Sequence, residues 1–293
     1  MSDFKIHPTS VLGPHVTVEP GAIIGANCTI EGRTRIGART TLAGGVALVG
    51  DVDVGADCII EANVSVTTAA ASDGPQARPL VIGAKARIGA GAVLSAGVRI
   101  GADATVEAGT VVLRDVPAHA VVRGNPGIVV GFQGPAVRAA DLIETVADPK
   151  VTGVAECGVA GVKIYRFPRV TDPRGSLTFG EFGRNIPFVP KRYFMVFDVP
   201  EGELRGGHAH ATCEELLLCI GGSVAIVVDD GKVREEIVLD SPDLGLYLPA
   251  RVWGIQYKYS PDAVLVVLAS HYFDPEDYIH TYDDFVADIA RRG

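Results

Sequence analysis

The stretch IGANCTIEGRTRIGARTTLAGGVAL, residues 24–48, repeats its pattern every six positions. Each unit opens on a branched aliphatic residue, often followed by glycine, with a small or β-branched residue four positions later. The count extends in both directions and is interrupted once. Its aliphatic positions are Leu12, Val18, Ile24, Ile30, Ile36, Leu42, Leu48, Val54, Ile60, Val66, Ile82, Ile88, Leu94, Ile100, Val106 and Val112. Such a repeat indicates an array of identical structural units.

A period of six fits neither an α-helix, with a period of 3.6, nor a half-buried strand, with a period of two. The unit is therefore a short strand plus a corner, and three units closing a triangular coil place each aliphatic residue inside. Glycine relieves the corner where a Cβ would clash. Ordering six residues costs roughly 6–12 kcal/mol, whereas burying one isoleucine returns about 1.5–3 kcal/mol. Only a stack of coils, which shares hydrogen bonds and a core, is expected to be stable.

Composition indicates the number of domains, the classes of partner and the compartment. The 293 residues favour about two domains, and a 47% apolar fraction is enough for a core in each. A net charge of −9 argues against nucleic acid or an anionic membrane as the main partner. The chain has no 18-residue apolar run, and MSDFKIHPTS, residues 1–10, lacks the apolar region of a signal peptide, so we expect a cytoplasmic protein. Five cysteines, an odd number, suit a reducing compartment. We expect four of them to be core residues: Cys28, Cys58, Cys213 and Cys219.

The hexads resemble the left-handed β-helix of hexapeptide acyltransferases over roughly residues 6–130. The break at 67–81, TTAAASDGPQARPLV, predicts a loop leaving the coil, and long loops on rigid scaffolds often carry function. Glu61 and Asn63 interrupt the strand before it and are our candidates for orienting an amine acceptor. The alternative is that both are ordinary solvated residues, and that the whole array is a structural scaffold.

The exit segment VLRDVPAHAVVRGNPGIVVGF, residues 112–132, resembles that of sugar-nucleotide N-acetyltransferases. The resemblance implies acetyl-CoA as co-substrate and places Arg114 and Arg123 near the CoA-binding end. It also implies a homotrimer, with the extruded loop reaching a neighbouring subunit. Residues 133–160 lack the hexad and predict a linker with a short helix at about 136–147.

From residue 161 the chain predicts an antiparallel β-sandwich or barrel. Asp229-Asp230-Gly231 is a hairpin signal, and one helix is expected at about Asp283–Arg291. GELRGGHAHATCEELLLCIGG, residues 202–222, fits the first motif of the cupin family, with His208 and His210 pointing to one face of a strand. The expected fold is all-β: an N-terminal left-handed parallel β-helix at 1–132, then a C-terminal cupin (jelly-roll) β-barrel at 161–293.

A metal remains possible on spacing alone, since two imidazoles and one carboxylate can hold iron. The second cupin motif would supply a further histidine where Gly254 stands. LRGGHAH, DDGK, GLYLP, DPRGSLTF and VLVVLASHYFDPEDYIHTYDDF together resemble the dTDP-sugar 3,4-ketoisomerases. This resemblance implies that no metal is used and that His208 and His210 handle protons through an enediol. Arg205 would then contact the diphosphate or the enediolate oxygen. Tyr193, which strand alternation places inside the barrel, is a second substrate-binding candidate.

The two resemblances together imply a bifunctional enzyme. Its substrates would be dTDP-linked deoxysugars: a 4-keto-6-deoxyhexose for the barrel and a 3-amino sugar for the β-helix. A separate PLP-dependent aminotransferase would act between the two steps. Two alternatives stay open: a nucleotide-sugar-binding scaffold with a non-catalytic cupin, and an acetyltransferase fused to a metal-dependent oxygenase or epimerase.

Overall fold

The computed structural model describes residues 4–67, 78–143 and 151–292. The chain divides into two compact units, Met1–Gln133 and Gly134–Gly293, and each is described by itself. Most of the loop predicted at 67–81 lies outside the described residues. Among those described, no helix has the length and apolar character needed to cross a membrane.

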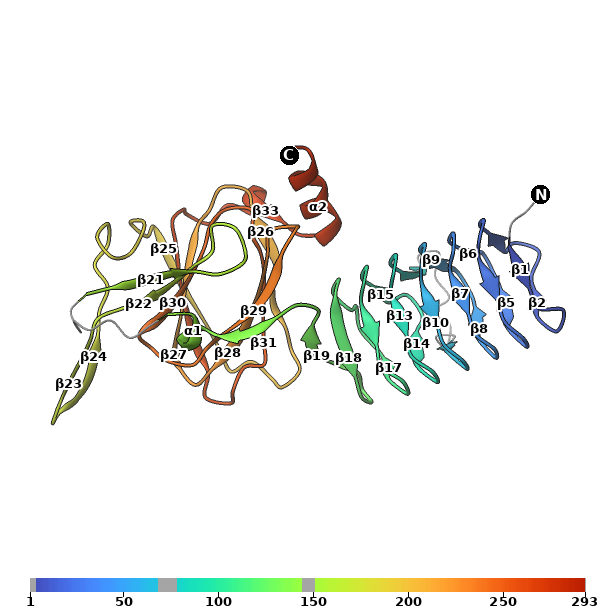
Figure 1. Cartoon of the computed structure of the whole chain (residues 1–293), viewed down its shortest axis with the longest axis horizontal. Helices are drawn as coiled ribbons and strands as arrows, with labels where there is room; N and C mark the ends of the chain where they lie inside the picture. Colours follow the sequence, from blue (N-terminus) through green and yellow to red (C-terminus); the bar gives the residue numbers. More distant parts are fainter. Residues whose placement is uncertain (1–3, 68–77, 144–150, 293) are drawn as a thin grey trace. The chain divides into compact units, whose positions relative to one another are not determined.

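The first unit is a β-solenoid with three faces (Figure 1). Each short strand pairs in parallel with the strand three hexads further on, as Ile23 with Thr41 and Thr41 with Ile59. The first face contains β1 (Lys5–Ile6), β4 (Ile23–Ile24), β7 (Thr41–Leu42), β10 (Ile59–Ile60), β13 (Arg87–Ile88), β16 (Thr105–Val106), β18 (Ala120–Arg123) and the antiparallel β19 (Ile128–Phe132). The second contains β2 (Val11–Leu12), β5 (Thr29–Glu31), β8 (Ala47–Val49), β11 (Ser65–Thr67), β14 (Val93–Ser95) and β17 (Val111–Val112). The third contains β3 (Thr17–Val18), β6 (Thr34–Ile36), β9 (Val52–Val54), β12 (Leu80–Ile82) and β15 (Arg99–Ile100).

The hexad predicts the core of this unit correctly. The aliphatic positions from Ile24 to Ile60 and from Ile82 to Val112 are at most 2% exposed. Leu12 and Val18 are only partly buried, because the end coils have a neighbour on one side. Cys28 and Cys58 lie in the same core, as expected.

The glycines after the aliphatic positions stand where a Cβ would clash, as predicted, and the clashing atoms belong to the next coil. A Cβ on Gly37 would lie 2.5 Å from the carbonyl carbon of Gly55, in the next coil. These glycines therefore permit close stacking of coils. The left-handed backbone of the corners falls on other residues, including Asn27, Asp57 and Asn63, with φ of 59°, 60° and 59°. Asparagine and aspartate tolerate this conformation better than most residues.

The second unit packs two six-stranded sheets against each other (Figure 1). One sheet carries His208 and His210 and is called the histidine sheet. It contains, in spatial order, β20 (Ala136–Arg138), β29 (Arg234–Leu239), β28 (Val224–Asp229), β31 (Trp253–Tyr257), β26 (Arg205–His210) and β33 (Tyr278–Ile279). The opposite sheet contains β21 (Gly153–Glu156), β22 (Lys163–Arg166), β30 (Leu244–Leu248), β27 (Glu215–Gly221), β32 (Val264–Ala269) and β25 (Arg192–Phe197). The remaining elements are the hairpin β23 (Arg169–Asp172) and β24 (Gly175–Thr178), α1 (Ala139–Leu142), the 3₁₀ helix η1 (Pro275–Asp277) and α2 (Tyr282–Ala290).

Strand pairing follows the expected antiparallel pattern. β28 and β29 form the hairpin predicted at Asp229-Asp230-Gly231, and Gly231 has a φ of 86°. The core between the sheets is aliphatic and includes Leu217, Cys219, Ile237, Leu246 and Val267. Cys213 is also buried.

The stretch 133–160, for which the sequence predicts a linker, contributes structure to the second unit. β20 pairs with β29, and β21 pairs with β22. Ala139, Ile143 and Val159 belong to the core of this unit. Their spacing matches neither a long helix nor a single strand, because two short strands and one helical turn share the stretch. Residues 144–150 lie outside the described part.

Candidate functional site

The candidate site begins with a bulge in β26. Arg205 pairs with Gln256, and His208 pairs with Gly254, so one residue of the Gly206-Gly207 pair is extra in the ladder. Both glycines have a φ of 72°, which a side chain would strain. Residues directly opposite each other on antiparallel strands share a face of the sheet. The bulge therefore brings Arg205 to the same face as His208.

A pocket opens on this face. It is lined by His208, His210, Cys213, Glu215, Leu248, Pro249, Val252, Gly254 and Gln256. Gly254 contributes no side chain, and a Cβ there would approach Leu248 to 3.2 Å. The position where a second cupin motif would supply a further histidine therefore carries no side chain, and Leu248 crowds it.

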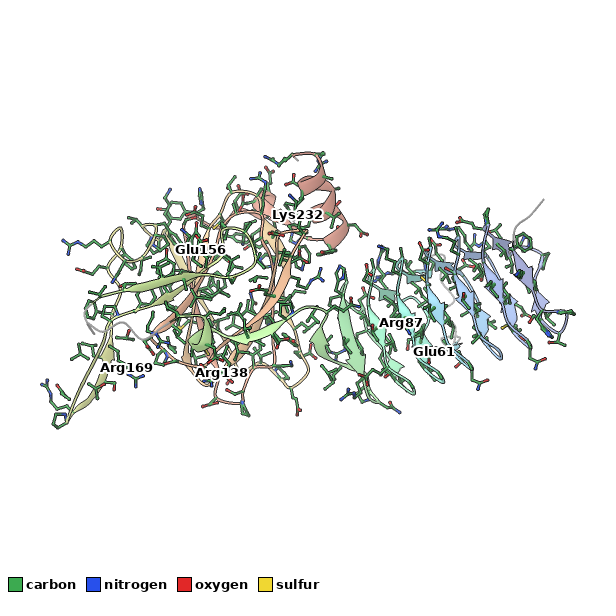
Figure 2. All side chains as sticks on the ribbon, viewed as in Figure 1. Glu61, Arg87, Arg138, Glu156, Arg169 and Lys232 are labelled. Atoms are coloured by element: carbon green, nitrogen blue, oxygen red, sulfur yellow. The ribbon has the colours of Figure 1, made fainter. Side chains whose placement is uncertain are left out.

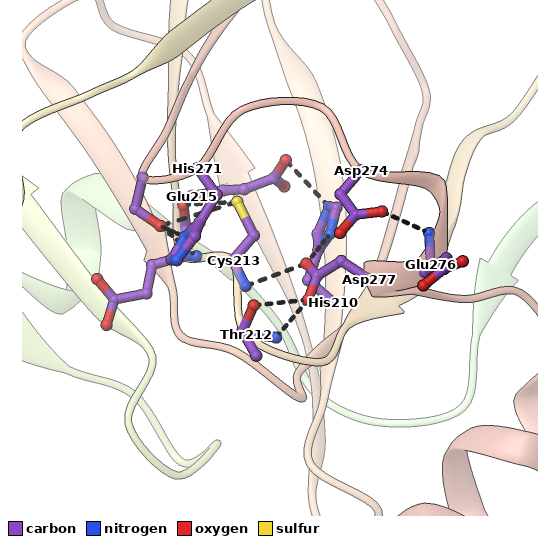
Figure 3. Close-up of polar contacts among 10 residues, drawn as sticks. His210, Thr212, Cys213, Glu215, His271, Asp274, Glu276 and Asp277 are labelled. Atoms are coloured by element: carbon purple, nitrogen blue, oxygen red, sulfur yellow. Dashed lines mark hydrogen bonds and ion pairs between the residues drawn. The ribbon is translucent and has the colours of Figure 1, made fainter.

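One side of the His210 ring is held by Asp277. His210 Nδ1 lies 3.0 Å from Asp277 Oδ2 (Figure 3). The same carboxylate accepts hydrogen bonds from the Thr212 and Cys213 backbone N–H groups and from the Thr212 hydroxyl. Burial opposes ionisation of Asp277, but these hydrogen bonds hold the pKa of its carboxyl below the usual value. Because an ionised carboxylate only accepts, Nδ1 carries the proton.

The other side of the ring faces Glu215. His210 Nε2 lies 3.4 Å from Glu215 Oε1. The two side chains belong to residues 6% and 7% exposed, yet neither atom completes a hydrogen bond within the described chain. The two atoms form an ion pair without a hydrogen bond. Buried polar atoms are nearly always hydrogen-bonded, so this pair leaves room in the pocket for a polar ligand group.

The two imidazoles have opposite pKa shifts. Burial and the charge of His210 lower the pKa of His208 below its usual value. Burial also disfavours protonated His210, but Glu215 and Asp277 outweigh it and raise the pKa of His210. The rings stand edge to face, with centroids 5.1 Å apart. The opposite shifts favour a neutral His208 beside a protonated His210.

The ring of Tyr278 packs against both imidazoles. Its ring centroid lies 4.4 Å from that of His210 and 4.9 Å from that of His208. Asp277 and Tyr278 come from the end of η1 and the start of β33, and β33 pairs with β26. Sequence analysis missed both as site residues, although they lie in the quoted segment HYFDPEDYIHTYDDF. Proximity across about 65 positions has no local signal.

One group of side chains has the composition of a metal site: His210, Cys213 and Asp277, with ligand atoms within 4.8 Å of one another. Two of its donors, however, are already hydrogen-bonded to each other. Asp277 Oδ2 also accepts the Cys213 backbone N–H. A cation would have to replace both interactions, so the donor set favours a hydrogen-bonded cluster over a metal centre.

Tyr193 does not lie where strand alternation predicted. It pairs with Leu268, on the face of β25 opposite the interior residues, and its residue is 67% exposed. The neighbouring Val196 packs on the inner core instead. The alternation of β25 is real, but its phase is the reverse of the predicted one, because both faces of this strand carry large apolar residues. Arg205, also exposed, stands on the pocket face by its pairing.

In the solenoid, Glu61 and Asn63 both contribute to the structure of the coils. Glu61 Oε2 accepts the Ala90 N–H at 3.0 Å, on the outside of the coils (Figure 2). Glu19 does the same for the Ala38 N–H at 2.9 Å, far from the interrupted hexad. Asn63 occupies a left-handed corner position and is exposed. The corner geometry alone thus accounts for both residue types.

The two arginines of the exit segment occupy different edges. Arg123 ends β18 on the first face, the face of β10, and so shares an edge with Glu61. With three strand spacings between them, the two are about 14 Å apart along the edge. Arg123 pairs with Glu107, its Nη2 lying 2.8 Å from Oε1. Arg114 follows β17 of the second face and is exposed.

Comparisons with known proteins agree with this division. Residues 160–290 match the family described as FdtA: WxcM-like, C-terminal. Residues 79–114 match the bacterial transferase hexapeptide repeat, and residues 29–68 match the hexapeptide repeat of succinyl-transferase. TDP-4-oxo-6-deoxy-alpha-D-glucose-3,4-oxoisomerase of Aneurinibacillus thermoaerophilus is 45% identical over 129 residues, which are 44% of this chain and 93% of that protein.

Solved structures of similar proteins each match part of the chain. A 3,4-ketoisomerase from Helicobacter canadensis is 35% identical with a TM-score of 0.43, covering 44% of this chain and 98% of its own. A variant of perosamine N-acetyltransferase from Caulobacter crescentus, solved with CoA and GDP-perosamine, is 29% identical with a TM-score of 0.40. That match covers 44% of this chain and 57% of the other. Through its second unit the chain belongs to the sugar 3,4-ketoisomerase family, and it joins that cupin domain to a hexapeptide-repeat acyltransferase domain.

Proposed function

We propose that the barrel converts a dTDP-4-keto-6-deoxyglucose to its 3-keto isomer. We further propose that the solenoid transfers an acetyl group from acetyl-CoA to the derived dTDP-3-amino-3,6-dideoxyhexose. The observation that carries the first activity is the pair His208 and His210, two imidazoles in one pocket with oppositely shifted pKa values. The 45% identical oxoisomerase supports the substrate class.

The isomerisation moves one proton between carbons and one between oxygens. Neutral His208 removes the C3 proton, and protonated His210 stabilises or protonates the C4 oxygen, which leaves an enediol. Return of the carbon proton at C4, with loss of the O3 proton, gives the 3-ketone. No redox equivalent is consumed. The division of labour predicts that activity falls at acid pH, as His208 gains a proton, and at alkaline pH, as His210 loses one.

Arg205 is the proposed contact for negative charge on the substrate. It lies on the pocket face but is exposed, which suits a diphosphate at the pocket mouth better than an atom at its floor. A guanidinium fork binds phosphate oxygens in a bidentate manner. Tyr193, being on the opposite face of β25, has no place in this assignment.

In the solenoid, the sugar amine attacks the acetyl carbonyl, a C–N bond forms, the C–S bond breaks and CoA leaves as the thiol. Glu61 and Asn63 remain the proposed orienting groups, with Arg114 and Arg123 near the phosphates of CoA. Glu107 already neutralises Arg123, so phosphate must compete with that carboxylate. Holding the two reactants together is the main contribution expected from the protein.

The homotrimer is also part of the proposal. The second face presents a row of small, uncharged residues outward: Val11, Thr29, Ala47, Ser65, Val93 and Val111. The third face instead presents charges, including Arg35, Asp53 and Arg99. A face of small, uncharged side chains can pack closely against other copies. A PLP-dependent aminotransferase would supply the amine between the two reactions.

The test is a product assay with the 4-keto sugar, an aminotransferase and acetyl-CoA, read by mass spectrometry. Solvent deuterium wash-in measures the first activity alone. We expect wash-in without added cofactor, and one acetyl group on the aminated product. Binding of the dTDP-sugar without wash-in would favour the non-catalytic scaffold instead.

A further inference from the structure

His210 lies between two carboxylates, and these differ in the hydrogen bonds that they accept. Asp277 Oδ2 meets Nδ1 at 3.0 Å, and it is shared with backbone and hydroxyl donors. Glu215 Oε1 faces Nε2 at 3.4 Å and is buried without a hydrogen bond from any described residue. Asp277 therefore fixes the ring, whereas Glu215 leaves its oxygen directed toward the pocket.

A buried carboxylate oxygen with no hydrogen bond is costly. Glutamine would fill the same volume and add a donor, so packing alone does not favour an acid here. What only glutamate supplies is negative charge beside Nε2, the ring atom on the side opposite Asp277. Charge at this distance in a low-dielectric site stabilises the protonated ring strongly.

We propose that Glu215 is a positioning residue of the isomerase site, which keeps the proton on His210 Nε2 for the oxygen of the enediol. This rests on the isomerase activity proposed above and assigns the open question of roles: His208 is the base and His210 the acid. When substrate enters, its C4 oxygen takes a hydrogen bond from Nε2. The proton transferred to that oxygen leaves a neutral His210, which is reprotonated on loss of the O3 proton.

Four other described groups face His210. They are His208 on β26, Cys213 on the turn before β27, Asp277 on η1 and Tyr278 on β33. Of these, Asp277 favours the protonated ring and His208 opposes it when charged. Glu215 is the carboxylate on the pocket side of the ring.

The test compares Glu215→Gln with Glu214→Gln in the full-length chain, using deuterium wash-in from pH 5 to 9. Glu214 is the neighbouring carboxylate, but its side chain is directed toward Tyr247, away from the pocket. Glu215→Gln should move the alkaline limb of the rate profile to lower pH by one pH unit or more. On that limb the variant's rate should be lower than the parent's by about tenfold for each pH unit that the limb moves. Below the limb the variant should retain a rate within about threefold of the parent. Glu214→Gln should leave the profile in place.

A second comparison places Glu215→Gln in a His210→Asn background. If Glu215 acts through His210, the added substitution changes the rate by less than about twofold, since the double-mutant cycle is then fully coupled. A pH-independent loss in Glu215→Gln, an unmoved limb, or additive losses in the double variant would overturn the inference. Absence of wash-in from the parent protein would instead refute the proposed isomerase itself.

Discussion

The solenoid and the barrel differ in what they bury. Among the described residues, the buried polar side chains of the solenoid are Thr34, Thr40 and Thr110, which carry no charge. Thr34 and Thr40 donate to backbone carbonyls of the coils. The barrel buries ionisable groups, including His210, Glu215, Asp229 and Glu236. Chemistry in the barrel can therefore take place inside one chain, whereas chemistry on the solenoid must use its outer surface.

The two carboxylates Glu61 and Glu215 show this difference directly. Glu61 is on the outer surface and its oxygen is satisfied by the Ala90 N–H, as Glu19 is by Ala38. Glu215 is buried, and its Oε1 faces His210 Nε2 at 3.4 Å without a hydrogen bond. A satisfied surface carboxylate that the repeat itself explains is weak evidence of a site. A buried carboxylate that lacks a hydrogen bond and faces an imidazole in a pocket is stronger evidence, because folding alone does not favour it.

The largest expected effect is on the stability of the second unit when it is produced without the solenoid. A chain of residues 134–293 keeps β20, α1 and β21 and should fold and isomerise. A chain of residues 161–293 loses Ala139, Ile143 and Val159 from its core, together with two paired strands. Burial of each larger aliphatic side chain is worth about 1.5–3 kcal/mol, so the loss is a large part of the 5–15 kcal/mol typical of a domain. Solubility and thermal unfolding of both chains are the measurements. Equal stability would mean that residues 134–160 are a linker after all.

The next effect tests the solenoid core. Ile36 is fully buried with coils on both sides, so Ile36→Asp should bury an unpaired carboxylate and cost at least about 3–5 kcal/mol. Because neighbouring coils share the core, we expect loss of the whole array and of the oligomer. Ile23→Asp is the matched control, since Ile23 is 43% exposed on an outer face. Denaturant unfolding and sedimentation of the two variants check this. A folded, acetyltransferase-active Ile36→Asp protein would contradict the hexad as the basis of the core.

A smaller effect concerns rate alone. His208→Asn and His210→Asn should each lower deuterium wash-in by about 10²–10⁴-fold, the usual loss of a general acid or base. Nucleotide-sugar binding should remain, because neither substitution alters Arg205. The rate of acetylation of a supplied dTDP-3-amino sugar, measured as CoA release, should be unchanged. A parallel fall of both rates would remove the case for two independent sites.

The last prediction is that removing metal ions does not change the isomerase rate. Gly254 stands where a metal ligand would, and Asp277 already occupies His210 Nδ1. Treatment with EDTA should therefore leave the isomerase rate within about twofold of the untreated protein, a difference below about 0.5 kcal/mol. Loss of activity on chelation, with recovery on adding Fe²⁺ or Zn²⁺, would show that the histidines bind a metal and would make the proton-transfer roles wrong.

The solenoid could be predicted from sequence almost residue by residue, because its contacts repeat at fixed intervals. Ile36 is buried for the same local reason as Ile30 and Leu42, and the parallel pairing follows from the count. The predicted Cβ clash at the glycines is confirmed, but the sequence did not show which backbone a Cβ would meet. Gly37 is required by Gly55 in the next coil, a contact between coils that a single hexad does not contain.

The barrel site could be predicted only in part. The i, i+2 spacing of His208 and His210 was sufficient to place them on one face, since strand alternation is local. Alternation failed for Tyr193, because β25 has apolar residues on both faces and its phase is set by β32. Alternation also fails for Arg205, which lies three residues before His208 yet on the same face. The bulge responsible depends on two left-handed glycines and the pairing with β31.

By itself, the sequence determined the two folds, the core of the coils and the histidine pair, since each depends on spacing along one strand or one repeat. Only the tertiary structure decided how the two histidines differ. Asp277 and Glu215 reach the ring from η1 and β27, and their charges raise the pKa of His210 while that of His208 falls. Charge at a few ångströms controls proton affinity, and those few ångströms are set by packing between segments far apart in the chain.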